Sequence, residues 1–431
     1  MTLLIIADDL SGAADCAIAF AGAGLSTVVT LDASHDTGDA SVVAIDTDTR
    51  RLSVAQAAEH TLTAYRTLLK PGQRLYKKID STLRGNWASE VAALQSHAGL
   101  AIVAPAFPAT GRTTLQGRVL VNGQPLETTD TWKLEHADRS ANIDTLLEGA
   151  GLRTAMLTLD TLRGDADALA GHIVEVAGSD IQALIVDAQT AEDLRTLAIV
   201  TANLSAPLFW VGSGGLAREL AALPDVLSAS GTSPVFAREK HAPTLVLVGS
   251  LSDVSQRQCA MLKERASIGE LVVPPAVLRQ GVAHADWAGW EMRIGEYLRR
   301  GEDLLLRIGR DEAFDPAEGA RLSTLLAALV RPHFAYVGGL VATGGETARA
   351  MLEAVGIGSL QLLCEIEAGV AFGRPIATRH GHRPGVVTKA GAFGTDHALY
   401  AAWLHMNNAV EPAEYAAGSV KHPALQGKHH E

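Results

Sequence analysis

Short apolar runs alternate with segments of helical pattern along most of this chain, and this alternation limits its possible folds more than any other feature. In the first half, the predicted strands cover residues 3–7, 27–31, 42–46, 75–79, 100–104, 183–187 and 208–211, and the predicted helices cover residues 13–23 and 54–69. In the second half, the predicted strands cover residues 244–248, 304–308, 338–342 and 386–388, with an apolar helix at 322–330. Strands that alternate with helices are typical of a parallel, doubly wound sheet. The sequence therefore predicts an α/β fold.

The length of the chain predicts two such units. At 431 residues it is longer than one hydrophobic core usually organises. Residues 231–243 begin with Gly-Thr-Ser-Pro and end with Ala-Pro, which is typical of a linker. We predict an N-terminal domain of residues 1–230, a linker of residues 231–243, a C-terminal domain of residues 244–411 and a loosely structured tail of residues 412–431. Each domain is expected to be a mainly parallel sheet flanked by helices.

Polar side chains follow several predicted strands of the first half. Asp8 and Asp9 follow the first strand, Arg50 follows the third, and residues 78–84 lie at the end of the fourth. In sheets of this kind, ligands bind beyond the carboxyl ends of the strands. We therefore expect these residues to line one pocket.

The segment KKIDSTLRGN at residues 77–86 is the most unusual stretch in the chain. It combines cations, a carboxylate, hydroxyls, a carboxamide and a glycine within an apolar neighbourhood. Such a mixture suits a pocket for a small, polyhydroxylated anion, because cations hold a carboxylate or phosphate and the other groups bind hydroxyls. The alternative is a solvated turn in which Ser81 or Thr82 caps a helix.

Charge and composition exclude several classes of function. The net charge of −12 argues against a nucleic-acid partner, which requires a basic surface. No Lys or Arg precedes Arg50, so the start lacks the positive region of a signal peptide, and no apolar stretch is long enough to cross a bilayer. The 3 dispersed cysteines indicate reduced thiols in a cytoplasmic protein. The oligomeric state is left open, with a homodimer as one alternative.

Three glycine-rich turns in the second half point to a nucleotide. They lie at residues 248–252, 343–347 and 388–394, each between a predicted strand and a helix. Backbone N–H groups at a helix N-terminus bind anions, and glycine lets a phosphate approach closely. Lys389 would add a positive charge on a transferring phosphoryl group. There is no P-loop sequence, and the Gly22-Ala-Gly24 stretch ends a predicted helix where a dinucleotide fingerprint would open one.

Taken together, these motifs resemble those of the four-carbon acid sugar kinases. The resemblance covers nearly the whole chain and rests on DDLSGA at 8–13, KKIDSTLRG at 77–85, PAFPATGR at 105–112, VGSGGL at 211–216, GSLS at 249–252, GGET at 344–347 and KAGAFG at 389–394. It implies an N-terminal domain that binds a four-carbon sugar acid, a C-terminal domain that binds ATP with Mg²⁺, an active site in the cleft between them, and a 4-phosphate product. The form of residues 78–85 is similar to the threonate and erythronate branch, with D-threonate as first choice.

The resemblance also implies roles for particular residues. The implied substrate contacts are Asp9, Arg50, Asp80, Ser81, Thr82, Leu83 and Arg84. The implied ATP contacts are Ser250, Gly344, Gly345, Glu346, Thr347 and Gly391. We expect Arg84, with Lys78 or Arg50, to clamp the substrate carboxylate, and Asp9 or Asp8 to orient the 4-hydroxyl as a base. Lys389 is the expected catalytic cation, and Arg112 is expected to reach substrate or phosphate.

Each of these residues also has an ordinary structural alternative. Asp8 and Asp9 could cap a helix, and Asp80 could pair with Lys77 or Arg84. Further alternatives are a loop-pinning role for Arg112, a helix cap at Ser250, and an acidic first-turn role for Glu346 in place of holding Mg²⁺ through water. No site is expected in which side chains alone hold a metal.

Alternative functions also remain open at this stage. Within the same chemistry, the acid could be D-erythronate, L-threonate or 3-oxo-tetronate. A second class is a sugar-acid or nucleotide sensor without turnover, because every residue singled out could bind without catalysing. A third class, an NAD-dependent oxidoreductase, is disfavoured by the lack of a well-placed fingerprint.

Overall fold

The computed structural model describes residues 2–129, 132–133, 140–223, 242–313, 315, 318–377, 381–391 and 393–407. We call residues 2–223 the first lobe and residues 242–407 the second lobe. The predicted linker lies outside the described residues except for its last two positions, and the predicted tail lies outside them entirely. The domain boundaries therefore stay a prediction.

The first lobe is a parallel sheet with strand order β2-β3-β1-β4-β11-β5-β10-β9. Its strands are β1 (Leu3–Ala7), β2 (Thr27–Thr30), β3 (Val42–Asp46), β4 (Arg74–Lys78), β5 (Leu100–Ala104), β9 (Thr154–Leu157), β10 (Ala183–Val186) and β11 (Leu208–Gly212). Its helices are α1 (Leu10–Gly22), α2 (Val54–Leu68), α3 (Trp87–Ala98), α5 (Ile143–Gly149), α6 (Leu159–Leu162), α7 (Ala166–Ala177), α8 (Ala191–Ala202) and α9 (Gly214–Ala221). A small antiparallel sheet is formed by β6 (Arg112–Leu115), β7 (Arg118–Val121) and β8 (Gln124–Pro125).

The second lobe contains a parallel sheet with strand order β13-β14-β12-β15-β18. These strands are β12 (Thr244–Val248), β13 (Gly269–Val273), β14 (Leu304–Ile308), β15 (Gly339–Thr343) and β18 (Gly385–Lys389). Beside β18 lie two further strands, β17 (Val370–Pro375) and β16 (Ser359–Glu367), which pair in antiparallel fashion. The helices are α10 (Asp253–Arg265), α11 (Pro275–Gln280), α12 (Trp287–Arg299), α13 (Gly319–Val330), α14 (Gly345–Ala354) and α15 (Ala398–Asn407).

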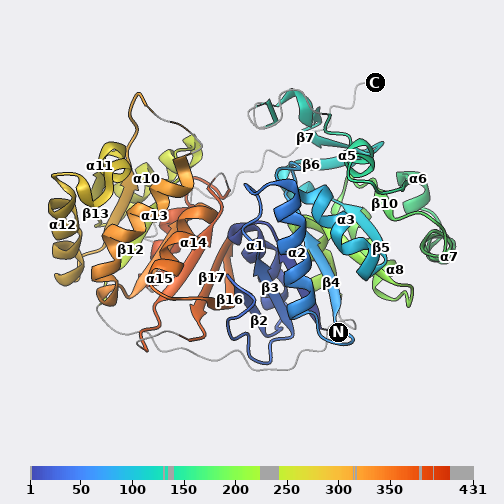
Figure 1. Cartoon of the computed structure of the whole chain (residues 1–431), viewed down its shortest axis with the longest axis horizontal. Helices are drawn as coiled ribbons and strands as arrows, with labels where there is room; N and C mark the ends of the chain where they lie inside the picture. The colour runs from blue at the N-terminus through green and yellow to red at the C-terminus, as the bar shows by residue number, and fades with distance from the viewer. Residues whose placement is uncertain are drawn as a thin grey trace, which may run out of the picture.

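The two lobes are joined edge to edge by main-chain hydrogen bonds between β16 and β2. This antiparallel pairing makes one continuous 15-stranded sheet across the molecule, with α1 and α14 side by side at the junction (Figure 1). The predicted two-domain α/β architecture is confirmed. The continuity of the sheet was not predicted, because residues 359–375 mix polar and half-exposed apolar residues and lack the apolar run of a central strand.

The buried core reflects this arrangement. Along β1, the side chains of Leu3 and Ile5 belong to an apolar cluster on one face of the sheet, and those of Leu4 and Ile6 belong to a cluster on the other face. Successive side chains of a strand point to opposite faces, so a strand covered on both sides must be apolar throughout. The first of these clusters continues into the second lobe, which makes the junction part of the core.

Within the described ranges, no helix is long and apolar enough to span a membrane.

Candidate active site

A cavity of about 720 Å³ lies between the two lobes, at the carboxyl ends of strands from both of them. Much of the predicted site lines this cavity, namely Asp8, Asp9, Arg50, Arg84, Ser250, Gly344, Gly345, Glu346, Thr347 and Gly391. The predicted residues that do not line it are Lys78, Asp80, Ser81, Thr82, Leu83, Arg112 and Lys389. The fold therefore brings together the charged residues of the first lobe and the glycine-rich turns of the second, which are far apart in the sequence.

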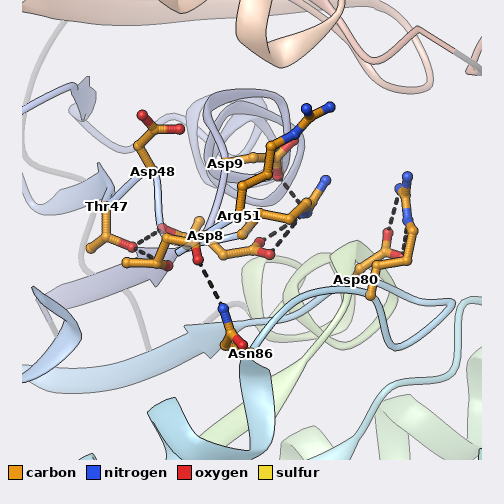
Figure 2. A network of polar contacts seen from close by, with 12 residues as sticks. Asp8, Asp9, Thr47, Asp48, Arg51, Asp80 and Asn86 are labelled. Carbon is orange, nitrogen blue, oxygen red and sulfur yellow. Dashed lines mark hydrogen bonds and ion pairs between the residues drawn. The ribbon is translucent and has the colours of Figure 1, made fainter. Parts of the chain in front are cut away.

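The first lobe contributes a pair of carboxylates bound to one arginine. Arg50 donates from Nε and Nη2 to Asp8 at 2.8 and 2.9 Å, and its Nη2 also lies 2.9 Å from Asp9 Oδ1 (Figure 2). Burial alone would raise the pKa of Asp8, but the Arg50 guanidinium outweighs it and holds that pKa below its ordinary value. Asp8 is therefore an ionised partner that fixes Arg50 in place.

Asp9 differs from Asp8 in having one oxygen directed across the cavity. Its Oδ1 accepts from the Gly12 amide at 3.1 Å and caps α1, as the structural alternative had it. Its Oδ2 lies 3.0 Å from the position that a Cβ on Gly345 would occupy, so this oxygen faces the start of α14 in the second lobe. Capping and a catalytic role are compatible here, because they use different oxygens.

The segment after β4 is organised around Asp80. Arg84 donates to both carboxylate oxygens at 2.7 and 3.1 Å, and the Thr82 hydroxyl and amide also donate to Asp80 (Figure 2). Burial opposes ionisation, but Arg84 and Arg50 hold the pKa of Asp80 well below its ordinary value. Leu83 has a positive φ of 57° and a buried side chain, so it shapes the turn. Asp80 is the structural partner of Arg84, while Lys77 pairs with the buried Glu90.

Two further cations near this segment have unused donors. Lys78 is 5% exposed, and none of the hydrogen bonds or ion pairs among the described residues involves its ammonium, which lies 3.1 Å from where a Cβ on Gly12 would be. The buried Arg112 Nε likewise has no hydrogen-bond partner within the part of the chain that the structure describes. Arg112 Nη1 donates to the carbonyl oxygen of Thr110, so this residue does pin its loop. A buried donor without a partner is costly, which makes both groups candidates for an anionic ligand.

In the second lobe, three glycine-rich turns converge at the ends of β12, β15 and β18. Gly344 begins α14 with φ 96° and no side-chain cap, so the first amides of this helix stay available to an anion. Ser252 and Ser255 donate to the carbonyl oxygen of Gly391 at 3.2 and 2.8 Å, which ties the first turn to the third. A Cβ on Gly391 would lie 2.7 Å from Ser250 Oγ. The cap of α10 is Ser252, so the predicted alternative of Ser250 as a cap is wrong.

Lys389 is used inside its own turn. Its ammonium donates to the carbonyl oxygens of Ala390, Gly391 and Phe393 at 2.8, 3.2 and 2.9 Å. The side chain is buried, and burial lowers the pKa of Lys389 to about 8. Contact of this ammonium with a phosphoryl group stays a prediction, whereas its role in shaping the turn is visible.

Arginine–carboxylate pairs cross the cavity between the lobes. Arg51 Nε lies 2.6 Å from Glu346 Oε1, and Arg349 Nη1 lies 2.7 Å from Asp46 Oδ2. Glu346 stands in the first turn of α14, as the structural alternative had it. These pairs connect the glycine-rich turn at the start of α14 and α14 itself to the strand ends of the first lobe.

Sequence reasoning missed Asp46, Asp48, Arg51 and Arg349, all of which line the cavity. Asp46 is the last residue of β3, and Asp48 and Arg51 come soon after it, so the strand-end rule that found Arg50 could also have found all three. Arg349 lies inside α14, where an arginine is ordinary, and no local signal marks it.

A magnesium ion fits this cavity only with help from other ligands. Within the described ranges, no group of three or more His, Cys, Asp or Glu side chains is placed to hold a metal ion. The carboxylates at the cavity are instead paired with arginines, as described for Asp8, Asp9, Asp46 and Glu346. This donor set suits Mg²⁺ held mainly by phosphate oxygens and water, which is its usual state beside a nucleotide.

Known proteins resemble this chain over nearly its full length. Residues 3–220 match the family model of a sugar-binding N-terminal domain, and residues 245–399 match that of a nucleotide-binding C-terminal domain. D-threonate kinases from Cupriavidus necator and Bordetella bronchiseptica are 53% and 34% identical to it, covering 96% and 92% of this chain and 100% and 95% of those proteins. A D-erythronate kinase from Heliobacterium modesticaldum is 28% identical, covering 92% of this chain and 95% of that protein.

A solved structure from Haemophilus influenzae shares the fold, with a TM-score of 0.71 and 22% identity over 93% of this chain and 99% of that one. The sequence matches extend through both halves, and the fold agrees with them. The chain belongs to the four-carbon acid sugar kinase family, and it is an ATP-dependent kinase.

Proposed function

We propose that this kinase transfers the γ-phosphoryl group of ATP to the terminal 4-hydroxyl of D-threonate and forms 4-phospho-D-threonate. The observation that carries this proposal is the shared cavity, in which the carboxylate and arginine set of the first lobe faces the glycine-rich turns of the second. The 53% identity to a D-threonate kinase over 96% of this chain supports D-threonate as the acid.

The substrate carboxylate would be held by the cations around Asp80. Arg84 reaches the cavity, while Lys78 and Arg112 supply buried donors that lack partners among the described residues. A carboxylate would satisfy these donors with charge-assisted hydrogen bonds. Hydroxyl groups and main-chain amides of residues 80–84 would complete the contacts to the acid.

Asp9 is the base in this proposal. Its Oδ1 is occupied by Gly12 and Arg50, and its Oδ2 faces Gly345 across the cavity. A 4-hydroxyl placed between Asp9 and the start of α14 would donate its proton to Oδ2 as it attacks. Both oxygens of Asp8 are bound by Arg50, so Asp8 would act through the position of Arg50.

The phosphates would lie on the turns that hold Ser250, Gly344–Thr347 and Gly391. The α14 amides and the helix dipole favour negative charge there. The triphosphate supplies the phosphoryl group, and Mg²⁺ would neutralise part of its charge, with Glu346 as a ligand through water. Lys389 would support this site by holding residues 390–393 in shape.

A substrate panel tests the proposal directly. Purified protein would be given ATP, Mg²⁺ and the D and L forms of threonate and erythronate, together with 3-oxo-tetronate. ADP release would be followed by a coupled assay, and the product would be identified by phosphorus NMR. We expect the highest kcat/KM with D-threonate and a phosphate ester on C4. Ligand-induced thermal stabilisation without any ADP would instead indicate a sensor. A homodimer, a cytoplasmic location and the domain boundaries at residues 230 and 244 stay predictions.

A further inference from the structure

Phosphoryl transfer requires a positively charged side chain beside the transferring group. The predicted one, Lys389, is bound elsewhere. Lys389 donates to three carbonyl oxygens of its own turn and does not line the cavity. Within the described part of the chain, the cations that do line it are arginines at positions 50, 51, 84 and 349. Three of these hold carboxylates that are buried, namely Asp8, Asp80 and Asp46. Arg51 is the exception.

Arg51 is bound to a carboxylate that water reaches. The Arg51 side chain is 51% exposed and that of Glu346 is 37% exposed. Exposed ion pairs are weak because water and salt screen them, so this pair can exchange readily. Burial raises the pKa of Glu346, with Asp48 and Asp9 adding to the effect, although the Arg51 guanidinium opposes it. The exposure of both side chains makes Glu346 a replaceable partner for the guanidinium.

The backbone that carries Arg51 is held by hydrogen bonds from neighbouring segments. Asn86 Nδ2 donates to the carbonyl oxygens of Thr49 and Leu52 at 3.1 and 2.8 Å, one on each side of the arginine pair. The Thr49 hydroxyl donates to the buried Glu90. Figure 2 shows Arg51 beside Asp9, with its side chain leading away from Asp8. A fixed backbone and an exposed guanidinium suit a residue whose side chain moves onto a ligand.

The position of Glu346 gives the direction of that movement. Glu346 belongs to the first turn of α14, whose free amides form the phosphate site in the proposed function. A polyphosphate bound there would bring several negative charges next to the Arg51–Glu346 pair. The guanidinium would gain from leaving one carboxylate for these charges, because bidentate arginine–phosphate pairs are strong.

We propose that Arg51 is a catalytic residue that rests on Glu346 and moves to the transferring phosphoryl group when both substrates are bound. This inference rests on the proposed kinase function. In the reaction, the 4-hydroxyl oxygen bonds to the γ-phosphorus while the bond from that phosphorus to the β–γ bridging oxygen breaks. ADP leaves with that electron pair, and the hydroxyl proton passes to Asp9. Arg51 exchanges no proton and stabilises the charge on the three equatorial oxygens.

The test compares Arg51→Ala and Arg51→Lys with the wild type in two measurements. The first is kcat with ATP and D-threonate. The second is the binding of MgADP in the presence of D-threonate and aluminium fluoride, which mimics the planar phosphoryl group. We expect Arg51→Ala to lower kcat by about 10²–10³-fold. Calorimetry should show that it also loses most of the extra affinity that aluminium fluoride gives the wild type, while the Kd for MgADP alone changes less than about threefold. Arg51→Lys should recover part of the loss, because lysine restores the positive charge but not the bidentate hydrogen bonding of the guanidinium.

Two controls distinguish this catalytic role from a structural one, in which the Arg51–Glu346 ion pair only holds the two lobes together. Arg118→Ala removes an arginine of similar exposure, 55%, that pairs with Glu127 away from the cavity, and it should leave kcat unchanged. If Arg51 only holds Glu346, then Arg51→Ala, Glu346→Ala and the double variant will show equal losses and Arg51→Ala will keep wild-type aluminium fluoride binding. That result would overturn the proposal. Failure of the proposed function looks different, because the wild type itself would then phosphorylate no acid.

Discussion

Arg349, in the second turn of α14, donates to the Asp46 carboxylate at the end of β3 at 2.7 Å and to the carbonyl oxygen of Leu31 after β2 at 3.2 Å. The helix that follows the turn proposed to bind phosphate is thereby docked onto two strand ends of the lobe that is proposed to bind the acid. Asp46 is buried while Arg349 reaches the cavity. The relative position of the two lobes at the cavity thus depends on this ion pair, together with the Arg51–Glu346 pair and the β2–β16 pairing.

Arg349→Ala should lower both activity and stability. It leaves the buried Asp46 Oδ2 without its hydrogen-bond donor, which costs roughly 1–3 kcal/mol of unfolding free energy, and it loosens α14. A misplacement of about 1 Å between reacting groups can cost about 10²-fold in rate, so we expect a loss of that order in kcat. Urea unfolding and steady-state kinetics measure the two effects.

The matched control for Arg349→Ala is Arg163→Ala, which breaks a bidentate pair with the buried Asp193 inside the first lobe. This variant should lose stability and keep its kcat. Equal kcat values for the two variants would show that docking of α14 is unimportant for the reaction.

Gly345→Ala should impair the enzyme by displacing the Asp9 carboxylate from the start of α14. The new Cβ would lie 3.0 Å from Asp9 Oδ2 and 3.2 Å from Ser11 Oγ, both in the opposite lobe. We expect kcat/KM to fall at least about tenfold, because the base and the phosphate turn move away from each other. Gly289→Ala, in α12 with open space around its Cα, should instead raise the unfolding free energy by about 0.5–1 kcal/mol without a change in kinetics. Normal kinetics for Gly345→Ala would refute the close approach of the two helix ends.

Arg84→Ala and Gly344→Val should affect the two substrates in opposite ways. Removal of the Arg84 guanidinium should raise the KM for the acid by about 10–100-fold, the loss expected for a charge-assisted hydrogen bond, with little change in the KM for ATP. Valine at position 344 would block the approach of a phosphate and is strained at φ 96°, so the KM for ATP should rise more. Both constants come from the coupled ADP assay. If each variant raised both KM values equally, the division of labour between the lobes would be wrong.

The pH dependence of stability should carry a contribution from Asp46. Burial raises the pKa of Asp46 to about 7, despite the attraction of Arg349, from about 3.9 in the unfolded chain. Between these values the folded protein holds a proton that the unfolded chain releases, so stability from this group is complete below pH 4 and is lost as the pH rises to 7. Relative to wild type, Asp46→Asn should gain about 1 kcal/mol per pH unit in that window.

Thermal unfolding of both proteins across pH 4.5–8 measures the difference in their stability. The prediction concerns how this difference changes with pH, because loss of the ion pair shifts it by the same amount at every pH. Asp180→Asn is the control, since Asp180 also pairs with an arginine but is 78% exposed. A constant difference between Asp46→Asn and wild type over the whole range would mean that Asp46 is ionised throughout.

The amino-acid sequence by itself determined the α/β class, most strands, and many of the residues that line the cavity between the lobes. These features are local, since apolar runs, glycine turns and polar strand ends are written within short segments. The β16–β17 pair was missed because its strands are half exposed and alternate irregularly. Arg349 was missed because one arginine within a helix carries no information about what it faces.

Only the tertiary structure decided how these sets meet. The pairing of β2 with β16 lies between residues more than 300 positions apart, and it determines that Asp9 faces Gly345 and that Arg51 reaches Glu346. The tertiary structure also decided that Lys389 donates its hydrogen bonds within its own turn, because neighbouring carbonyl oxygens surround the buried ammonium. Such outcomes depend on the distances between segments remote in the chain, which packing and main-chain pairing establish and no local pattern encodes.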